Sequence, residues 1–367
     1  MPLAPGSART PRKSATAFQP LTTTTAMPSL PDNLEAIRSR VFIEAGVPTH
    51  TAGIDDALAF KSLNIDNSLD LDRFREGLKC SVLRLNEQEI VFELVGIDAP
   101  IANALRRVLI AEVPTIAIEK VNIYQNTSIM QDEVLAHRLG LVPILADPRK
   151  MEYPGERATP QNTLVFTLVV TCTENPRATA LDPPHVRYIN SNVYSRNLKW
   201  VPQPGQEEMF EGSPPRVVDG DILLCQLRPG QTLELELFCE KGIGQTHAKW
   251  SPVCTASYKL KPEVIIPRKL TGSTAEALVN VCPMNVFDIE DDQAVVARPD
   301  KCTMCRECIR DKPWGADGVQ LRRIRDHFIF TVESTGIYRP DELLAEALDV
   351  LVSKCNTIVT CLDELHR

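Results

Sequence analysis

Four of the eleven cysteines lie between residues 282 and 308, where their side chains could do chemistry. Cys302, Cys305 and Cys308 are separated from one another by two residues, and Cys282 stands next to Pro283. Thiolates at such short spacing hold metal ions or iron–sulfur clusters, whereas disulfide frameworks belong to secreted chains. The N-terminal residues show no apolar signal segment. We therefore expect a metal or iron–sulfur site rather than disulfides.

The spacing of these cysteines matches part of a two-cluster ferredoxin motif. Bacterial-type ferredoxins use Cys-x2-Cys-x2-Cys-x3-Cys-Pro, and the fourth cysteine ligates the other cluster. Here Lys312 occupies the fourth position of one motif, whereas Cys282-Pro283 supplies the fourth position of the motif before it. Crossed ligation therefore predicts one structural [4Fe–4S] cluster held by Cys282, Cys302, Cys305 and Cys308. A four-cysteine zinc site is the alternative, and a relic with free cysteines and no metal is a third possibility.

A small α/β unit precedes this cysteine cluster. Residues 82–85 and 90–94 are aliphatic runs on either side of a polar turn, which predicts two paired strands. Asp98 can cap a helix, and Pro114 would end it. Residues 116–124 then return as a strand. The local pattern therefore predicts a β-β-α-β unit.

The rest of the chain divides into a strand-rich stretch and a terminal helix. We expect a short helix at about residues 132–139 and strands within residues 145–260, because aliphatic and β-branched runs alternate there with polar loops. Residues 286–297 read as a hairpin beside the cysteines. Residues 319–332 read as a second hairpin, followed by a helix at 340–365.

The terminal helix carries an apolar seam. Its apolar residues recur at alternating spacings of four and three, as in a heptad repeat: Leu344, Leu348, Leu351, Cys355, Ile358 and Leu362. Such a face can cover the chain's own sheet, which is the commoner fate of an amphipathic helix, or it can meet a partner helix. The width of the stripe slightly favours a partner.

Composition narrows the classes of function. The formal net charge of -8 argues against a large nucleic-acid footprint made by this chain alone. No apolar run approaches the ~20 residues that span a bilayer. Residues 1–31 contain no acidic residue and are rich in Pro, Ser and Thr, which predicts a disordered tail. The chain also lacks a compact Asp-x-Asp-x-Asp group that could hold catalytic magnesium.

Three stretches of sequence resemble one known family. Residues 96–114 (GIDAPIANALRRVLIAEVP) resemble the motif that opens the dimerisation helix of RNA polymerase alpha-like subunits. Residues 132–143 (DEVLAHRLGLVP) and 241–252 (KGIGQTHAKWSP) are similar to two further motifs of its eukaryotic and archaeal branch. The resemblance covers about residues 78–365.

Within that family, the chain resembles the larger alpha-like subunits that RNA polymerases I and III share. Residues 119–128 and 227–231 favour this branch over the polymerase II counterpart. The counterpart usually carries a zinc loop of closely spaced cysteines, whereas the corresponding stretch here holds only isolated Cys172, Cys225, Cys239 and Cys254. A polymerase II or archaeal subunit is the alternative, as is, in another class, a ferredoxin-type electron-transfer protein.

The resemblance implies an α+β fold. An alpha-like dimerisation domain, a sheet with two long helices, would be interrupted by a β-rich insert domain and a ferredoxin-like cysteine module. The expected parts are a disordered tail (1–31), an N-terminal extension (32–77), a discontinuous dimerisation domain (78–124 and 318–367), the insert domain (125–261) and the cysteine module (262–317).

The resemblance also implies partners and a role without catalysis. The chain would form a heterodimer with the smaller alpha-like subunit and then recruit the second-largest and largest polymerase subunits, together with small shared subunits, in the nucleoplasm and nucleolus. DNA would be reached only indirectly. Arg106 and Arg107 would dock the large subunits. The dimerisation residues would be those of the seam and of the first helix, namely Ile101, Leu105, Val108 and Leu109.

Overall fold

The computed structural model describes residues 31–51, 68, 70–179, 182–310, 313–314 and 318–365. The expected disordered tail lies outside the described residues except for Pro31. Among the described residues, no helix combines the length and the apolar character that crossing a bilayer requires.

The first layer is an antiparallel sheet built from both ends of the chain. Its six strands run in the order β2-β1-β18-β4-β3, and β15 also pairs with β18. Their bounds are β1 (Arg40–Ile43), β2 (Pro48–Thr49), β3 (Lys79–Leu85), β4 (Glu89–Val95), β15 (Val253–Ile265) and β18 (Gln320–Ser334). The register of β4 against β18 sets Val95 opposite His327 and Glu89 opposite Glu333.

Two helices cover one face of this sheet. They are α4 (Ala99–Ala111), which packs mainly on β15, and α9 (Pro340–Leu365), which packs on α4, β18 and β4. Phe92 and Phe330 lie under them as stacked rings with centroids 5.0 Å apart, both fully buried. Each large side chain buried in this way contributes about 1.5–3 kcal/mol. Two shorter helices, α1 (Asp32–Ser39) and α3 (Leu71–Gly77), precede β1 and β3.

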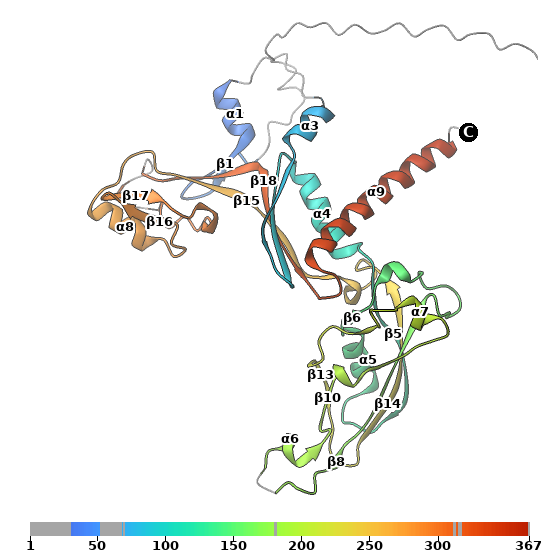
Figure 1. Ribbon diagram of the computed structural model, residues 1–367. Coiled ribbons are helices and arrows are strands. Elements are labelled where there is room, and N and C mark those ends of the chain that lie inside the picture. The colour runs from blue at the N-terminus through green and yellow to red at the C-terminus, as the bar shows by residue number, and fades with distance from the viewer. Residues whose placement is uncertain are drawn as a thin grey trace, which may run out of the picture.

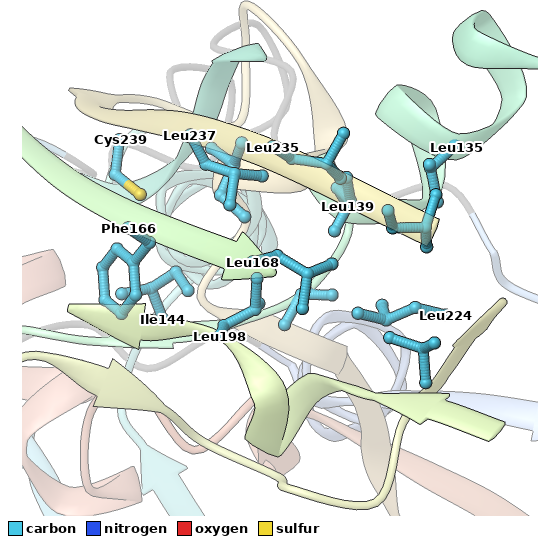
Figure 2. Close-up of a cluster of buried hydrophobic side chains, with 14 of the residues drawn as sticks. Leu135, Leu139, Ile144, Phe166, Leu168, Leu198, Leu224, Leu235, Leu237 and Cys239 are labelled. Carbon is cyan, nitrogen blue, oxygen red and sulfur yellow. The ribbon is translucent and has the colours of Figure 1, made fainter. Parts of the chain in front are cut away.

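A second sheet forms a separate lobe, seen at the lower right of Figure 1. Its strand order is β11-β7-β14-β5, with β5 (Thr115–Asn126), β7 (Thr163–Thr171), β11 (Lys199–Val201) and β14 (Thr232–Gly242). Helix α5 (Asp132–Gly140) packs on β5, and its Leu135 and Leu139 enter a core with Phe166 and Leu237 (Figure 2). Along most of β14, buried residues alternate with half-buried or exposed ones, as expected for a sheet whose second face is more open to water.

Short elements complete this lobe. The strand pairs are β6 (Ile144–Leu145) with β12 (Arg216–Val217), β8 (Thr173–Glu174) with β9 (Tyr188–Ile189), and β10 (Asn192–Tyr194) with β13 (Leu223–Gln226). The short helices are α6 (Pro184–Arg187), α7 (Gln206–Met209), and the 3-10 turns η1 (Pro148–Lys150), η2 (Ser195–Asn197) and η3 (Ala248–Trp250).

The cysteines lie in a third, smaller unit at the left of Figure 1. It contains α8 (Ser273–Val281), the hairpin β16 (Phe287–Glu290) and β17 (Gln293–Val296), and the turn η4 (Pro299–Lys301). Leu278, Phe287 and Trp314 form its core together with Val41 and Ile43 of β1. The predicted hairpin at residues 286–297 is therefore present, with Asp291 and Asp292 in left-handed conformations at its turn.

The expected hairpin at residues 319–332 is wrong. Residues 320–334 form one continuous strand, β18, and the polar pair Arg325-Asp326 lies within it instead of forming a turn. This pair is tolerated because β18 changes neighbours along its length: its first half pairs with β1 and its second half with β4, while β15 accompanies both. The strand therefore joins the cysteine unit to the main sheet.

Three expected boundaries also differ from the structure. The strand at residues 115–126 pairs with β14 in the second sheet and does not close the β-β-α-β unit. The strand at 253–265, expected in the insert, pairs with β18 in the first sheet. The main sheet also begins before residue 78, because β1 pairs with β18 and buries Val41 and Ile43.

Candidate functional site

Helix α9 has two different halves. Its start is buried on the sheet through Pro340, Leu343 and Ala347. From residue 352 to residue 365 every side chain is exposed, and this part of the helix projects away from the rest of the molecule (Figure 1). An apolar helix surface left open in this way is typical of a site that binds another protein.

The structure divides the predicted seam between these two halves. Leu344 and Leu351 are half-buried against the chain's own core. The remaining seam residues are exposed, namely Leu348, Cys355, Ile358 and Leu362. Val352 and Val359, each 56% exposed, extend the open apolar surface. The helix thus covers its own sheet with one end and leaves the other end for a partner.

The predicted dimerisation residues of α4 are mostly internal. Leu105, Val108 and Leu109 are buried in the core beneath the helices, so they cannot contact a partner directly. They support α4 from within the fold. Ile101 is the exception, at 48% exposed. The periodicity of the helix identified its apolar face but could not tell which partner the face meets.

Strand β3 adds apolar surface that sequence reasoning missed. All its residues are exposed, and Val82, Leu83 and Leu85 are about half exposed or more. It is an edge strand, so one side of its backbone is also unpaired within the sheet. An exposed strand with three large apolar residues was visible in the sequence, but its position at the edge was not.

The two arginines proposed for docking differ in their surroundings. The Arg106 guanidinium donates to Asn103 Oδ1 from Nε and Nη2, at 3.1 and 2.9 Å, which fixes it one turn back along α4. Arg107 is exposed. Both side chains therefore lie at the surface of the helix, and Arg106 is held in a defined direction.

The motif at residues 241–252 joins the second lobe to the end of α4. A Cβ atom on Gly244 would lie 2.3 Å from the carbonyl oxygen of Ile110, so only glycine lets these backbones approach. The neighbouring amide of Gln245 donates to the Ala111 carbonyl at 2.8 Å and so satisfies a free carbonyl at the helix end. Trp250 packs on Gly242 and donates to the Glu240 carbonyl at 3.1 Å. The motif therefore fixes the junction of the two lobes.

The motif at residues 132–143 is structural in the same sense. Arg138 on α5 donates to the Leu224 carbonyl from Nε and to the Leu223 carbonyl from Nη2. This ties α5 to β13 across the core. His137 on the same helix is exposed and lies edge-on to His247 at 6.5 Å between ring centroids.

The four predicted cysteine ligands line one small cavity. Cys282 follows α8, whereas Cys302, Cys305 and Cys308 lie in the loop after η4. The structure therefore brings together the set that the crossed motif predicted. The backbone amide of Val286 lies 3.4 Å from the Cys282 sulfur and donates to it.

The cysteine loop has a distinctive backbone. Met304 and Arg306, on either side of Cys305, both have positive φ, at 59° and 69°. Left-handed residues in a tight loop can turn successive amide N–H groups inward, and such concavities hold anionic groups that include iron–sulfur clusters. Thiolate ligands with nearby amide donors are therefore compatible with this loop.

When no cation is bound, burial disfavours the deprotonated form of the cysteines in this cavity. Burial raises the pKa of Cys302, and together with the neighbouring cysteine sulfurs it raises the pKa of Cys308 to about 12. A bound cation would reverse this, because metal coordination deprotonates thiols. Across the described parts of the chain, no group of three or more His, Cys, Asp and Glu side chains is gathered closely enough to hold one metal ion.

The isolated cysteines of the second lobe have another role. Cys172, Cys225 and Cys239 are buried free thiols in its core, where they pack as small apolar side chains. Cys254 is exposed on β15. Burial raises the pKa of Cys239, as expected of an inert thiol in apolar surroundings.

Comparison with known proteins agrees with this architecture. Residues 91–355 match the RNA polymerase Rpb3/Rpb11 dimerisation domain. The chain is 47% identical to DNA-directed RNA polymerases I and III subunit rpac1 of Dictyostelium discoideum, over 91% of this chain and 96% of the relative. It is 44% identical to the human RPAC1 subunit over 91% of this chain and 98% of the relative. Identity to RNA polymerase II subunit rpb3 of Dictyostelium discoideum is 33%, over 76% and 92%.

These matches span both helices of the main sheet and the lobes between them. The chain therefore belongs to the family of the RNA polymerase Rpb3/Rpb11 dimerisation domain.

Proposed function

We propose that this protein is the non-catalytic assembly subunit shared by DNA-dependent RNA polymerases I and III. The observation that carries this proposal is the exposed apolar half of α9, in a chain similar over 91% of its length to subunits named for these two polymerases. Within one organism the similarity falls from 47% for the polymerase I and III subunit to 33% for the polymerase II subunit. That difference favours the shared subunit over its polymerase II counterpart.

The first partner in this proposal is the smaller alpha-like subunit. Its helices would cover the exposed surface of α9, with Ile101 of α4 at the margin. The residues assigned to the contact are Ile101, Leu348, Val352, Cys355, Ile358, Val359 and Leu362. Each is solvent-exposed here, so association would remove apolar surface from water, which is the main favourable term in such complexes.

Further contacts of this pair complete the assembly. Arg106 and Arg107 would dock the second-largest and largest subunits, because guanidinium groups on an exposed helix can form bidentate contacts with carboxylates. Small shared subunits would join the same assembly. The protein would act in the nucleus, in both nucleolus and nucleoplasm, and would reach DNA only through its partners, in keeping with the net charge of -8.

Each structural unit of the chain has its own part in this proposal. The first sheet with α4 and α9 serves as the dimerisation domain, the second sheet as the insert, and the unit around the cysteines as a ferredoxin-like module. The junction motif at residues 241–252 would keep the insert at a fixed angle to α4. A fixed angle matters because partners would contact both parts.

Cys282, Cys302, Cys305 and Cys308 would hold one [4Fe–4S] cluster, which would cross-link the loop after η4 to the end of α8. The shared cavity and the amide donated to Cys282 support this assignment. Zinc is the alternative occupant. Protein purified without oxygen should be brown and contain iron and acid-labile sulfide, and Cys305→Ser should lose both. Colourless protein with stoichiometric zinc, or with no metal, would rule out the cluster.

Affinity purification of the tagged full chain tests the main proposal. Mass spectrometry should identify the smaller alpha-like subunit and the large subunits of polymerases I and III in comparable amounts. Recovery of polymerase II subunits alone would contradict the proposal. Recovery of a reductase without polymerase subunits would instead favour the electron carrier that the cysteines alone could suggest.

A further inference from the structure

The N-terminal strand β1 lies against the wall of the cysteine cavity. Its register with β18 sets Ile43 opposite Leu321, and Leu321 is one of the residues that line the cavity. Val41 and Ile43 are each only 9% exposed. They pack in the same apolar cluster as Met304 and Cys308. A segment more than two hundred residues away in sequence therefore completes the environment of the cysteine loop.

The cysteine loop is also bonded directly to the turn that follows β1. Arg306 lies between Cys305 and Cys308 and lines the cavity. Its Nη1 atom donates to the Gly46 carbonyl at 2.5 Å. Arg306 has a positive φ of 69°, an uncommon conformation for a side chain of this size. The hydrogen bond to Gly46 thus holds the loop at a residue whose backbone conformation is unfavourable.

The same segment is anchored at its start to the main sheet. Arg40 pairs with Glu263 of β15 at 3.1 Å, and both side chains are about three-quarters covered. Residues 40–46 thus run from the main sheet to the cysteine loop, attached at one end by Arg40 and at the other by Gly46. We call this segment the strap.

We propose that the strap retains the group bound by the four cysteines, with Arg306 as the residue that fastens the loop to it. This inference rests on the proposed metal or cluster site. The loop at residues 302–308 carries three of the four cysteines, and its movement away from β1 requires the bond from Arg306 to Gly46 to break. By thermodynamic linkage, whatever the strap adds to the affinity for the bound group, the bound group returns as stability of the strap.

The first test measures how fast the group is lost to a chelator. Wild-type full-length protein is loaded without oxygen with ferrous iron and sulfide, or with zinc, and is then mixed with excess chelator. Arg306→Gln should lose its metal about tenfold faster, because removal of one bond worth about 1.4 kcal/mol changes a rate by that factor. Arg310→Gln is the matched control, since it makes the same change on an exposed residue that pairs with Glu307 and does not reach the strap.

The second test measures the reciprocal effect by hydrogen exchange. Removal of the metal should raise the amide exchange of residues 40–46 and leave that of β14 unchanged. The double variant Val41→Ser/Ile43→Ser should show rapid exchange whether or not metal is present, and circular dichroism of the main sheet serves as its folding control. The strap proposal would be wrong if Arg306→Gln and wild type released metal at equal rates and the amide exchange of residues 40–46 did not depend on metal.

The two proposals fail in different ways. If the wild-type protein takes up neither iron nor zinc, the cysteine site itself is wrong and the strap has nothing to retain. If it binds metal normally and the release rates of all variants agree, only the strap is wrong. Polymerase assembly is expected to be unchanged in Arg310→Gln in either case.

Discussion

Lys354 of α9 donates to both carboxylate oxygens of Glu112, the residue that caps the C-terminal end of α4, at 2.9 Å each. The pair joins the two helices at the point where α9 leaves the body of the protein, since all side chains from residue 355 to residue 365 are exposed. Buried contacts fix the start of α9, and this ion pair fixes its direction of exit. The angle at which the helix is presented to a partner depends on both.

Reversal of this charge should weaken the docking of α9. Lys354→Glu places two carboxylates together, and because Lys354 is about half exposed the expected loss of unfolding free energy is small, about 0.5–1 kcal/mol. Urea unfolding of the isolated chain measures this loss. The exchange variant Glu112→Lys/Lys354→Glu should recover most of the stability. No recovery in the exchange variant would show that the pair is not coupled.

A charge in the exposed seam should abolish heterodimer formation and spare the fold. Val359→Asp changes a side chain that is 56% exposed in this chain, so thermal unfolding of the chain alone should hardly change. In the complex the carboxylate would be buried without a partner, which costs several kcal/mol. Co-expression with the smaller alpha-like subunit followed by gel filtration should show separate proteins.

The polar face of the same helix provides the control for this variant. Thr357→Asp adds the same charge on the opposite side of the helix, where Ser353 and Thr360 also lie. It should leave the heterodimer intact. A stable complex with Val359→Asp, or equal loss with both variants, would show that the partner binds another face.

Glycine at position 244 should be required for the junction of the two lobes. Gly244→Ala would force a Cβ atom against the Ile110 carbonyl, and we expect a loss of about 1–3 kcal/mol. Gly155→Ala is the control, because the nearest atom to its added Cβ lies 3.9 Å away. Thermal unfolding distinguishes them: the first variant should unfold at a lower temperature, and the second should match the wild type. Two equally stable variants would mean that the junction can shift without cost.

The stability of the main sheet should depend on pH through Glu93. Burial raises the pKa of Glu93, but hydrogen bonds and charge from His327 and Lys261 outweigh this and hold the pKa below its ordinary value. A carboxyl group whose pKa is lower in the folded protein than in the unfolded chain stabilises the fold at every pH above its unfolded-state pKa. This stabilisation is lost as the pH falls through its folded-state pKa. Glu93→Gln should therefore be less stable than wild type at pH 7, by about 1–3 kcal/mol, and the two should converge in acid. A constant difference across the pH range would assign the effect to packing.

Local signals predicted some elements almost to the residue. Pro340 with Asp341 and Glu342 marks the start of α9, and the predicted span of 340–365 agrees with the structure. Helix α4 begins after Asp98 as its capping position and Pro100 indicate, and ends before Pro114. The crossed ferredoxin motif groups cysteines twenty positions apart, and these four cysteines line one cavity; their binding of a cluster stays a prediction.

Non-local pairing explains what the sequence could not reveal. Strand β1 has four residues and no strong pattern, and it becomes buried only because β18 lies beside it. The pair Arg325-Asp326 resembles a turn, yet the strand continues because neighbouring strands pair with it on both sides. Leu105 and Leu348 both fit an apolar helical face, but only the packed sheet shows that the first is buried and the second is open.

The continuous strand β18 also has a consequence for biosynthesis. Strand β4 ends at residue 95 and pairs on one edge with β3 just before it, but its partner on the other edge, β18, begins only at residue 320. The second sheet needs only residues 115–242 and can close while translation continues. On the ribosome, this edge of β4 therefore stays unpaired with β18 until residues 320–334 have emerged. The exposed part of α9 is synthesised later still, so the proposed pairing with the smaller subunit would follow the synthesis of all these strands.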